Sequence, residues 1–165
     1  MKWYAVYTKP QNEFKVNEIL QKKEVEVFLP TILRPGRSGR KRVMRETPLF
    51  RSYIFVKVQA KTPRFYSVLD TPGVMYVVGN KEGPVPIPDR EIESLRILVD
   101  NAREDIFASP YLAEGDRVLI IDGPLKGAEG VLIKKDRKKY AFVVNIHLLG
   151  RSCGVPINPE FVKKI

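Results

Sequence analysis

The run from Pro48 to Val58, PLFRSYIFVKV, constrains the fold more than any other part of this chain. It is rich in aromatic and β-branched residues, which favour strands. Successive side chains of a strand point to opposite faces, so the even positions form an apolar set and the odd positions mix aromatic with cationic residues. The pattern predicts a strand whose apolar face packs on helices. Tyr53 and Phe55 then either meet a partner on the other face or belong to a sheet covered on both sides.

The rest of the N-terminal part alternates strand and helix patterns. Apolar residues at three- and four-residue steps indicate helices, and alternation over short runs indicates strands. We expect an α+β fold in which helices pack on a mainly antiparallel sheet. The predicted strands cover residues 3–8, 25–33, 48–58 and 74–79, and the predicted helices cover residues 11–23, 64–70 and 89–102.

The C-terminal part has a different sequence pattern, in which short strand-like runs are separated by turn residues. Five short strands in so few residues are typical of a small β-barrel, and their β-branched residues favour a stable one. We expect a first domain over residues 1–105, a linker over 106–113 and the barrel over 114–165. The predicted barrel strands cover residues 117–122, 130–135, 140–147, 152–157 and 161–164.

Composition narrows the class of partner. The chain carries a formal charge of +10, which favours a polyanion, most often nucleic acid. With one cysteine it can form no internal disulfide, which fits the cytoplasm. Neither a signal-peptide core nor a run of apolar residues long enough for a membrane span is present. We therefore expect a soluble cytoplasmic protein.

The cations are densest between Arg34 and Arg45. Seven Lys or Arg residues stand here if Arg51 is included, against the single acid Glu46, and glycines and a proline interrupt the run. These breakers predict a flexible loop or a hairpin tip. Such a tip suits phosphate contacts, and arginine can also read base edges. The alternative is a solvated run of charge with no ligand.

No set of residues indicates catalysis. His147 is the only histidine, and Cys153 lies six residues away without a third partner, whereas a metal site needs three or four ligands. The glycine-rich phosphate-binding motifs are absent. We expect no enzyme activity, no metal and no cofactor.

Several motifs together resemble the NusG family of transcription elongation factors. WYAVYTKP, VFLPT, PLFRSYIFVKV, TPGVMYVVG and PVPIPDREIESL are similar to its NGN domain, and EGDRVLIIDGPLKGAEGVLIKKD is similar to its KOW module. KOW modules also occur in ribosomal proteins, so the order and spacing of both parts carry the resemblance. It implies an NGN domain followed by a five-stranded KOW barrel, acting as a monomer.

The resemblance also implies partners. NGN domains bind the clamp helices of the largest RNA polymerase subunit, and the matching positions here are Phe50, Tyr53 and Phe55. Phe50 has the other strand parity, so either a bulge re-aims it or it belongs to the core. In the family the KOW barrel can bind the ribosomal protein S10 or the termination factor Rho. The segment HLLGRSCGVPI matches that loop and places the contact on Leu148, Leu149 and Arg151, although either leucine could instead be a barrel core residue.

Two departures from the general pattern indicate a specialised paralogue, similar to RfaH, UpxY or LoaP. Arg51 replaces a proline, and the cationic run is richer than a general factor needs. Such paralogues act at particular operons and are recruited by an RNA hairpin or by non-template DNA. The contacting cations would be Lys9, Arg34, Arg37, Arg40, Lys41 and Arg42. The alternatives are a general NusG-type factor that couples polymerase to Rho or the ribosome, and a ribosome-associated RNA-binding KOW protein.

Overall fold

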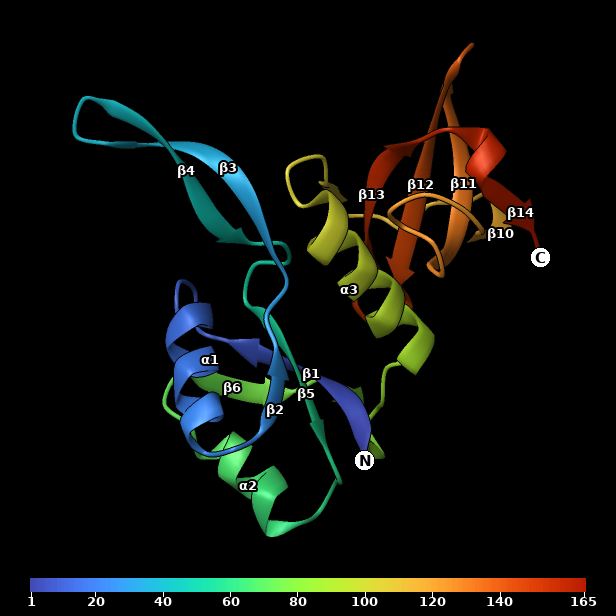
Figure 1. Cartoon of the computed structure of the whole chain (residues 1–165). Helices are drawn as coiled ribbons and strands as arrows, with labels where there is room; N and C mark the ends of the chain where they lie inside the picture. The colour runs from blue at the N-terminus through green and yellow to red at the C-terminus, as the bar shows by residue number, and fades with distance from the viewer. The chain divides into compact units, whose positions relative to one another are not determined.

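The computed structural model describes residues 1–165, which divide into two compact units (Figure 1). The first unit comprises residues 1–30 and 50–89, and the second comprises residues 31–49 and 90–165. No helix in the structure has the length and apolar character that crossing a membrane requires.

The first unit is built on a four-stranded antiparallel sheet in the order β2-β5-β1-β6. Strand β5 lies between β1 and β2, with Tyr7 opposite Tyr53 and Phe28 opposite Phe55. The sheet confirms the predicted antiparallel arrangement. Its strands are β1 (Lys2–Thr8), β2 (Glu26–Phe28), β5 (Tyr53–Val58) and β6 (Val74–Val77).

Two helices cover the even face of β5, as its apolar pattern predicts. They are α1 (Glu13–Lys22) and α2 (Pro63–Leu69), and the side chain of Thr62 caps α2 by accepting a hydrogen bond from the Phe65 backbone N–H. Their apolar residues form one core with the strands. This core contains Tyr4, Val6, Val16, Leu20, Val25, Ile54, Val56, Val58, Phe65 and Val68.

The predicted strand over residues 48–58 is wrong in its first half. A turn at residues 49–52 separates β4 from β5, and Ser52 adopts a left-handed backbone conformation with φ of 66°. Two hydrogen bonds hold the turn: the Ser52 carbonyl accepts from Thr8 N–H at 2.8 Å, and the Ser52 N–H donates to Glu13 Oε2 at 3.1 Å. The strand periodicity therefore does not apply to Phe50.

A long two-stranded ribbon joins the basic residues. Strands β3 (Thr31–Ser38) and β4 (Lys41–Pro48) pair along their whole length (Figure 1). The two-residue loop is Gly39-Arg40, and Gly39 has φ of 65°, which fits the glycine preference at the first loop position of type II′ hairpins. The predicted strand over residues 25–33 is accordingly two strands, β2 and β3, separated at Pro30. A second, two-residue ribbon pairs β7 (Gly79–Asn80) with β8 (Gly83–Pro84).

The second unit contains a six-stranded antiparallel sheet, one strand more than the five predicted. The extra strand is β9, which lies in the predicted linker and pairs with β13, so that Cys153 is opposite Ala108. In spatial order the sheet runs β14 (Val162–Lys164), β10 (Asp116–Ile120), β11 (Glu129–Asp136), β12 (Lys139–Ile146), β13 (Arg151–Ile157) and β9 (Phe107–Ser109).

Helix α3 (Asp89–Ala102) bonds directly to this sheet. The carboxylate of Glu91 accepts the His147 backbone N–H at 3.2 Å and lies 2.9 Å from His147 Nδ1. One turn on, Ser94 Oγ accepts the Glu129 backbone N–H at 2.9 Å. Both helix side chains are buried, so polar groups as well as the apolar stripe of α3 fix its inner side.

Candidate nucleic-acid and protein interfaces

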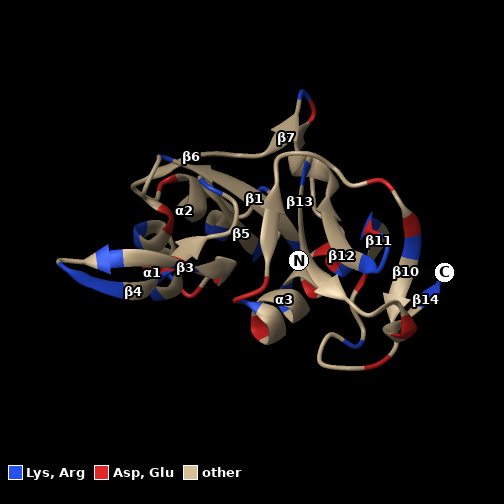
Figure 2. Ribbon diagram, turned by 90° about the horizontal axis from the view of Figure 1, so that it is seen from above, with Lys and Arg blue, Asp and Glu red and all other residues tan.

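The β3–β4 ribbon presents a dense set of exposed cations. Figure 2 shows blue along much of β4 and at the tip. Six cationic side chains lie on the ribbon, and all of them are exposed: Arg34, Arg37, Arg40, Lys41, Arg42 and Arg45. The hairpin thus brings together five of the six predicted nucleic-acid-binding residues. The sixth, Lys9, is exposed after β1 in the first unit.

The register of the ribbon places like charges directly opposite each other. Arg34 faces Arg45, and Arg37 faces Arg42. Directly opposed like charges destabilise a strand pair. Arg45 relieves part of this by lying across Gly36 and donating a hydrogen bond from its guanidinium to the Arg37 carbonyl. A polyanion along the ribbon would remove the repulsion, which a solvated surface without a ligand leaves in place.

The one acid of the ribbon is already neutralised at its base. Glu46 Oε1 accepts a hydrogen bond from Thr31 Oγ1 at 2.9 Å and forms an ion pair with the Arg103 guanidinium. Arg103 also bonds the carbonyl and hydroxyl oxygens of Thr31. These contacts anchor the ribbon where it starts, and leave the cations farther out without an acidic partner on the ribbon.

Of the three residues expected to contact polymerase, only Tyr53 reaches the surface, where it is half-buried. Phe50 is 2% exposed and Phe55 is 0% exposed, so both rings are buried in this structure. The Phe55 ring lies 6.2 Å from that of Phe28 and 6.4 Å from that of Phe50, centroid to centroid. For Phe55 the core alternative holds.

Tyr53 belongs to an aromatic group that sequence reasoning missed. The Tyr7 ring contacts Tyr53 edge-on at 5.4 Å and stacks on Tyr76 at 5.0 Å. Tyr76 is 50% exposed. The pairing of β1 with both β5 and β6 brings the three tyrosines together, because Tyr7 is opposite Tyr53 on one side and Tyr76 on the other. We call Tyr7, Tyr53 and Tyr76 the tyrosine cluster.

The predicted contact loop of the barrel is a short 3₁₀ turn between β12 and β13. It covers His147–Leu149, and Gly150 ends it with φ of 64°. Leu148, Leu149 and Arg151 are half-buried, so each offers part of its side chain to solvent. His147, which sequence reasoning left without a role, connects this loop to Glu91 of α3.

The structure contains no group of three or more His, Cys, Asp or Glu side chains that could hold a metal ion. Cys153 is fully buried in β13, and burial raises its pKa to about 12. The thiol is therefore protonated at neutral pH and is poorly suited to act as a nucleophile.

Comparisons with known proteins identify both parts of the chain. Residues 1–96 match the family model described as transcription termination factor nusG, and residues 114–147 match that of the KOW motif. The transcription termination/antitermination protein NusG of Rickettsia bellii is 28% identical over 99% of this chain and 90% of its own length. That of Borreliella burgdorferi is also 28% identical, over 99% of this chain and 98% of its own.

A solved structure agrees with these matches. The structure titled "Domain interaction in Thermotoga maritima NusG" has a TM-score of 0.57 and 30% identity, covering 99% of this chain and 97% of that one. The relatives carry the general NusG name, which fits the general alternative better than the expected specialised paralogue. The chain belongs to the NusG family, with an NGN part and a KOW part, and is a non-enzymatic transcription termination/antitermination factor of the NusG type.

Proposed function

We propose that this chain binds the clamp helices of RNA polymerase through its NGN part and contacts nucleic acid through the β3–β4 ribbon during elongation. Family membership implies the polymerase. The opposed arginine pairs of the ribbon are the main support for the nucleic-acid contact. Their repulsion destabilises the free hairpin, and bound phosphates would relieve it.

The tyrosine cluster supports the polymerase contact. Tyr53 is the candidate position that remains accessible, and its packing against Tyr7 holds the ring in place before a partner arrives. Rigid aromatic anchors lose little conformational entropy on binding and are enriched among binding hot spots. Phe50 and Phe55 are buried, and the Phe55 ring lies close to those of Phe28 and Phe50.

Two roles remain open within this proposal. The general role, in which the KOW part couples polymerase to Rho or to ribosomal protein S10 through Leu148, Leu149 and Arg151, is supported by the names of the relatives. Operon-specific antitermination, guided by an RNA hairpin or non-template DNA, is the second candidate, and the six exposed cations of the ribbon favour it. We propose that residues 1–105 and 114–165 act as the two functional modules of a cytoplasmic monomer.

The ribbon is tested by changing Arg37, Arg40, Lys41 and Arg42 to alanine and measuring binding to single-stranded DNA, duplex DNA and RNA hairpins over a salt series. The matched control removes four exposed cations elsewhere, Lys15, Lys61, Lys81 and Lys126. We expect the ribbon variant alone to lose most binding. Equal losses in both variants would mean that the charge acts only in general attraction. Selectivity for one ligand would favour the operon-specific role.

The polymerase contact is tested with Tyr53→Ala, measured by retention of the protein on immobilised RNA polymerase. Truncating a hot-spot aromatic costs about 2 kcal/mol or more, which corresponds to roughly 30-fold weaker binding. The control is Tyr66→Ala on α2, because Tyr66 is 51% exposed and lies outside the tyrosine cluster. Retention of the Tyr53 variant at the level of the control would contradict this contact.

A further inference from the structure

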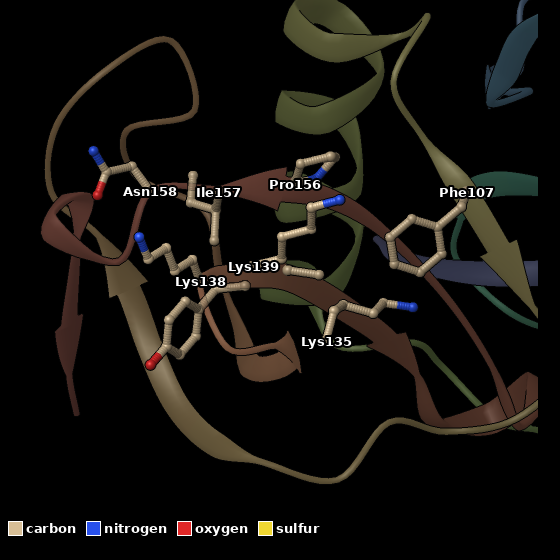
Figure 3. A pocket seen from close by; sticks show the side chains of 9 residues that line it. Phe107, Lys135, Lys138, Lys139, Pro156, Ile157 and Asn158 are labelled. Atoms are coloured by element: carbon tan, nitrogen blue, oxygen red, sulfur yellow. The ribbon is translucent and has the colours of Figure 1, made fainter.

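A groove of about 680 Å³ lies on the barrel at the end opposite the 147–149 turn of strand β12. Four strands and the segment after β13 contribute to it. Its lining residues are Phe107, Lys135, Lys138, Lys139, Tyr140, Ala141, Pro156, Ile157 and Asn158 (Figure 3). None of them is one of the predicted contact residues Leu148, Leu149 and Arg151, although Pro156 and Ile157 end the segment that matches the loop for Rho or S10. The groove lies at the other end of β13 from that predicted contact.

The chemistry of the groove combines an apolar floor with cationic sides. Figure 3 shows Phe107 at one end, Lys138 and Asn158 at the other, and Lys135 and Lys139 between them. The hairpin end formed by the last residues of β11, the turn at 137–138 and the first residue of β12 has the sequence KKDRKK over residues 134–139, with five cations and one acid. None of the three lining lysines forms an ion pair within the chain, and all three are exposed. The groove therefore attracts an anionic ligand with apolar parts.

Two local features shape this surface. Gly154 lacks a side chain, and a Cβ there would lie 2.7 Å from the Phe107 ring, so glycine allows the ring to lie close against β13. The pairing of β11 with β12 shifts register between Lys134 and Asp136, which leaves Lys135 as an extra residue in a bulge. Bulges re-aim side chains, and here the Lys135 ammonium lies 4.4 Å from the centre of the Phe107 ring.

We propose that this groove binds single-stranded RNA. Aromatic rings and apolar side chains offer faces for bases, while the lysines bind the phosphates. The Tyr140 hydroxyl and the Asn158 amide are polar groups in the same groove that can bond the 2′-hydroxyl. An acidic peptide could also pair with the lysines, but RNA carries one phosphate per nucleotide and matches this density of cations better.

The inference deepens the proposed function, on which it rests for the source of the RNA, namely the transcript of the bound polymerase. It assigns a second nucleic-acid contact, carried by the KOW part and independent of the β3–β4 ribbon. The two contacts use different residues, so variants of each can fail separately.

The first test is the affinity of the full chain for a fluorescein-labelled oligouridylate of about twelve nucleotides. In the groove variant Lys135, Lys138 and Lys139 become glutamine; the matched control carries Lys15→Gln, Lys61→Gln and Lys81→Gln. We expect the groove variant to bind at least about tenfold more weakly. The slope of log K against log salt concentration should become less negative by about 2, because each of the three lost phosphate contacts contributes about 0.7 for a single strand. Equal affinity in the two variants would overturn the proposal.

The second test locates the contact by photo-crosslinking of thiouridine-containing RNA, followed by mass spectrometry. Adducts on Phe107 or Tyr140 are expected, also in the chain whose ribbon arginines are changed to alanine. Adducts confined to the ribbon would reject the groove while leaving the proposed function intact. Two competition results would also overturn the assignment. One is tighter binding of oligothymidylate DNA than of RNA. The other is displacement of the RNA by a tryptophan-containing polyglutamate peptide at a lower concentration than by unlabelled RNA.

Discussion

Cys153 provides a probe of the barrel because it is the only cysteine and has no exposed surface. Burial raises the pKa of its thiol from 9.0 to about 12. Folded protein therefore keeps the thiol protonated at a pH where the unfolded chain has lost that proton. Since the unfolded state then binds fewer protons, the free energy of unfolding falls as pH rises.

We predict that the free energy of unfolding declines between about pH 9 and 12 by as much as ~1.4 kcal/mol per pH unit through this one group. The measurement is urea unfolding at several pH values, compared with Cys153→Ala, which lacks the titrating thiol. The difference between the two proteins isolates the contribution of Cys153 from that of every other group. A constant difference across this range would show that the thiol is ionised in the folded barrel.

At the residue scale, sequence parity predicts Ile54, Val56 and Val58 correctly as core, because helices cover that face of β5. Alternation leaves Phe55 open, because it states which face a side chain takes and not whether that face is covered. The structure buries Phe55. Phe50 is buried, as its even position predicts, although the turn at Ser52 separates it from the strand and its ring lies beside that of Phe55. The tyrosine cluster requires the strand order, which no local pattern contains.

Among the elements, the β3–β4 ribbon allows stability and binding to be changed in opposite directions. In Arg37→Glu a carboxylate faces Arg42 in place of a second guanidinium. Opposite charges at such a pair stabilise by roughly 0.2–1 kcal/mol. We predict slower amide hydrogen exchange in the ribbon, measured by NMR, together with weaker nucleic-acid binding.

The control for this change is Arg40→Glu, which alters the charge equally in the loop where no cross-strand residue faces it. It should weaken nucleic-acid binding without slowing exchange. Faster exchange in Arg37→Glu than in the parent chain would show that the opposed arginines do not strain the ribbon.

The attachment of α3 to the barrel depends on Glu91. Its carboxylate is buried and serves both the backbone and the ring of His147. We predict that Glu91→Ala lowers the free energy of unfolding by about 1–3 kcal/mol, because the His147 backbone N–H and ring lose their buried acceptor. Glu93→Ala, which removes an exposed acid from the same helix, should change it by less than about 0.5 kcal/mol in urea unfolding.

Element types were predictable where the periodicity is long, as in α3, whose observed range equals the predicted 89–102. The extra strand β9 was not, because three residues carry too little pattern and its pairing depends on the free edge of β13. The hairpin tip was predicted from its glycines, but the length of the ribbon was not, since charged residues mask strand patterns.

For the molecule as a whole, the α+β part and the all-antiparallel part follow from the change in sequence texture near residue 114. We predict that a fragment of residues 104–165 retains a β-type circular dichroism spectrum, because its six strands pair into one sheet and Val131, Ala141 and Val143 form a core cluster within it. A fragment of residues 110–165, which lacks β9, should unfold at lower urea concentration. A helical spectrum from the longer fragment would contradict the autonomy of the barrel.

Strand β9 also sets the length of the linker between α3 and the barrel sheet. When β9 pairs with β13, only residues 103–106 connect α3 to the barrel sheet, and this linker spans under roughly 20 Å when fully extended. If β9 dissociates from β13, the linker extends over residues 103–115 and can span roughly 50 Å. Three residues of pairing thus keep this connection short, and the KOW part could use the longer connection only if the contacts of Glu91 and Ser94 with the barrel opened as well.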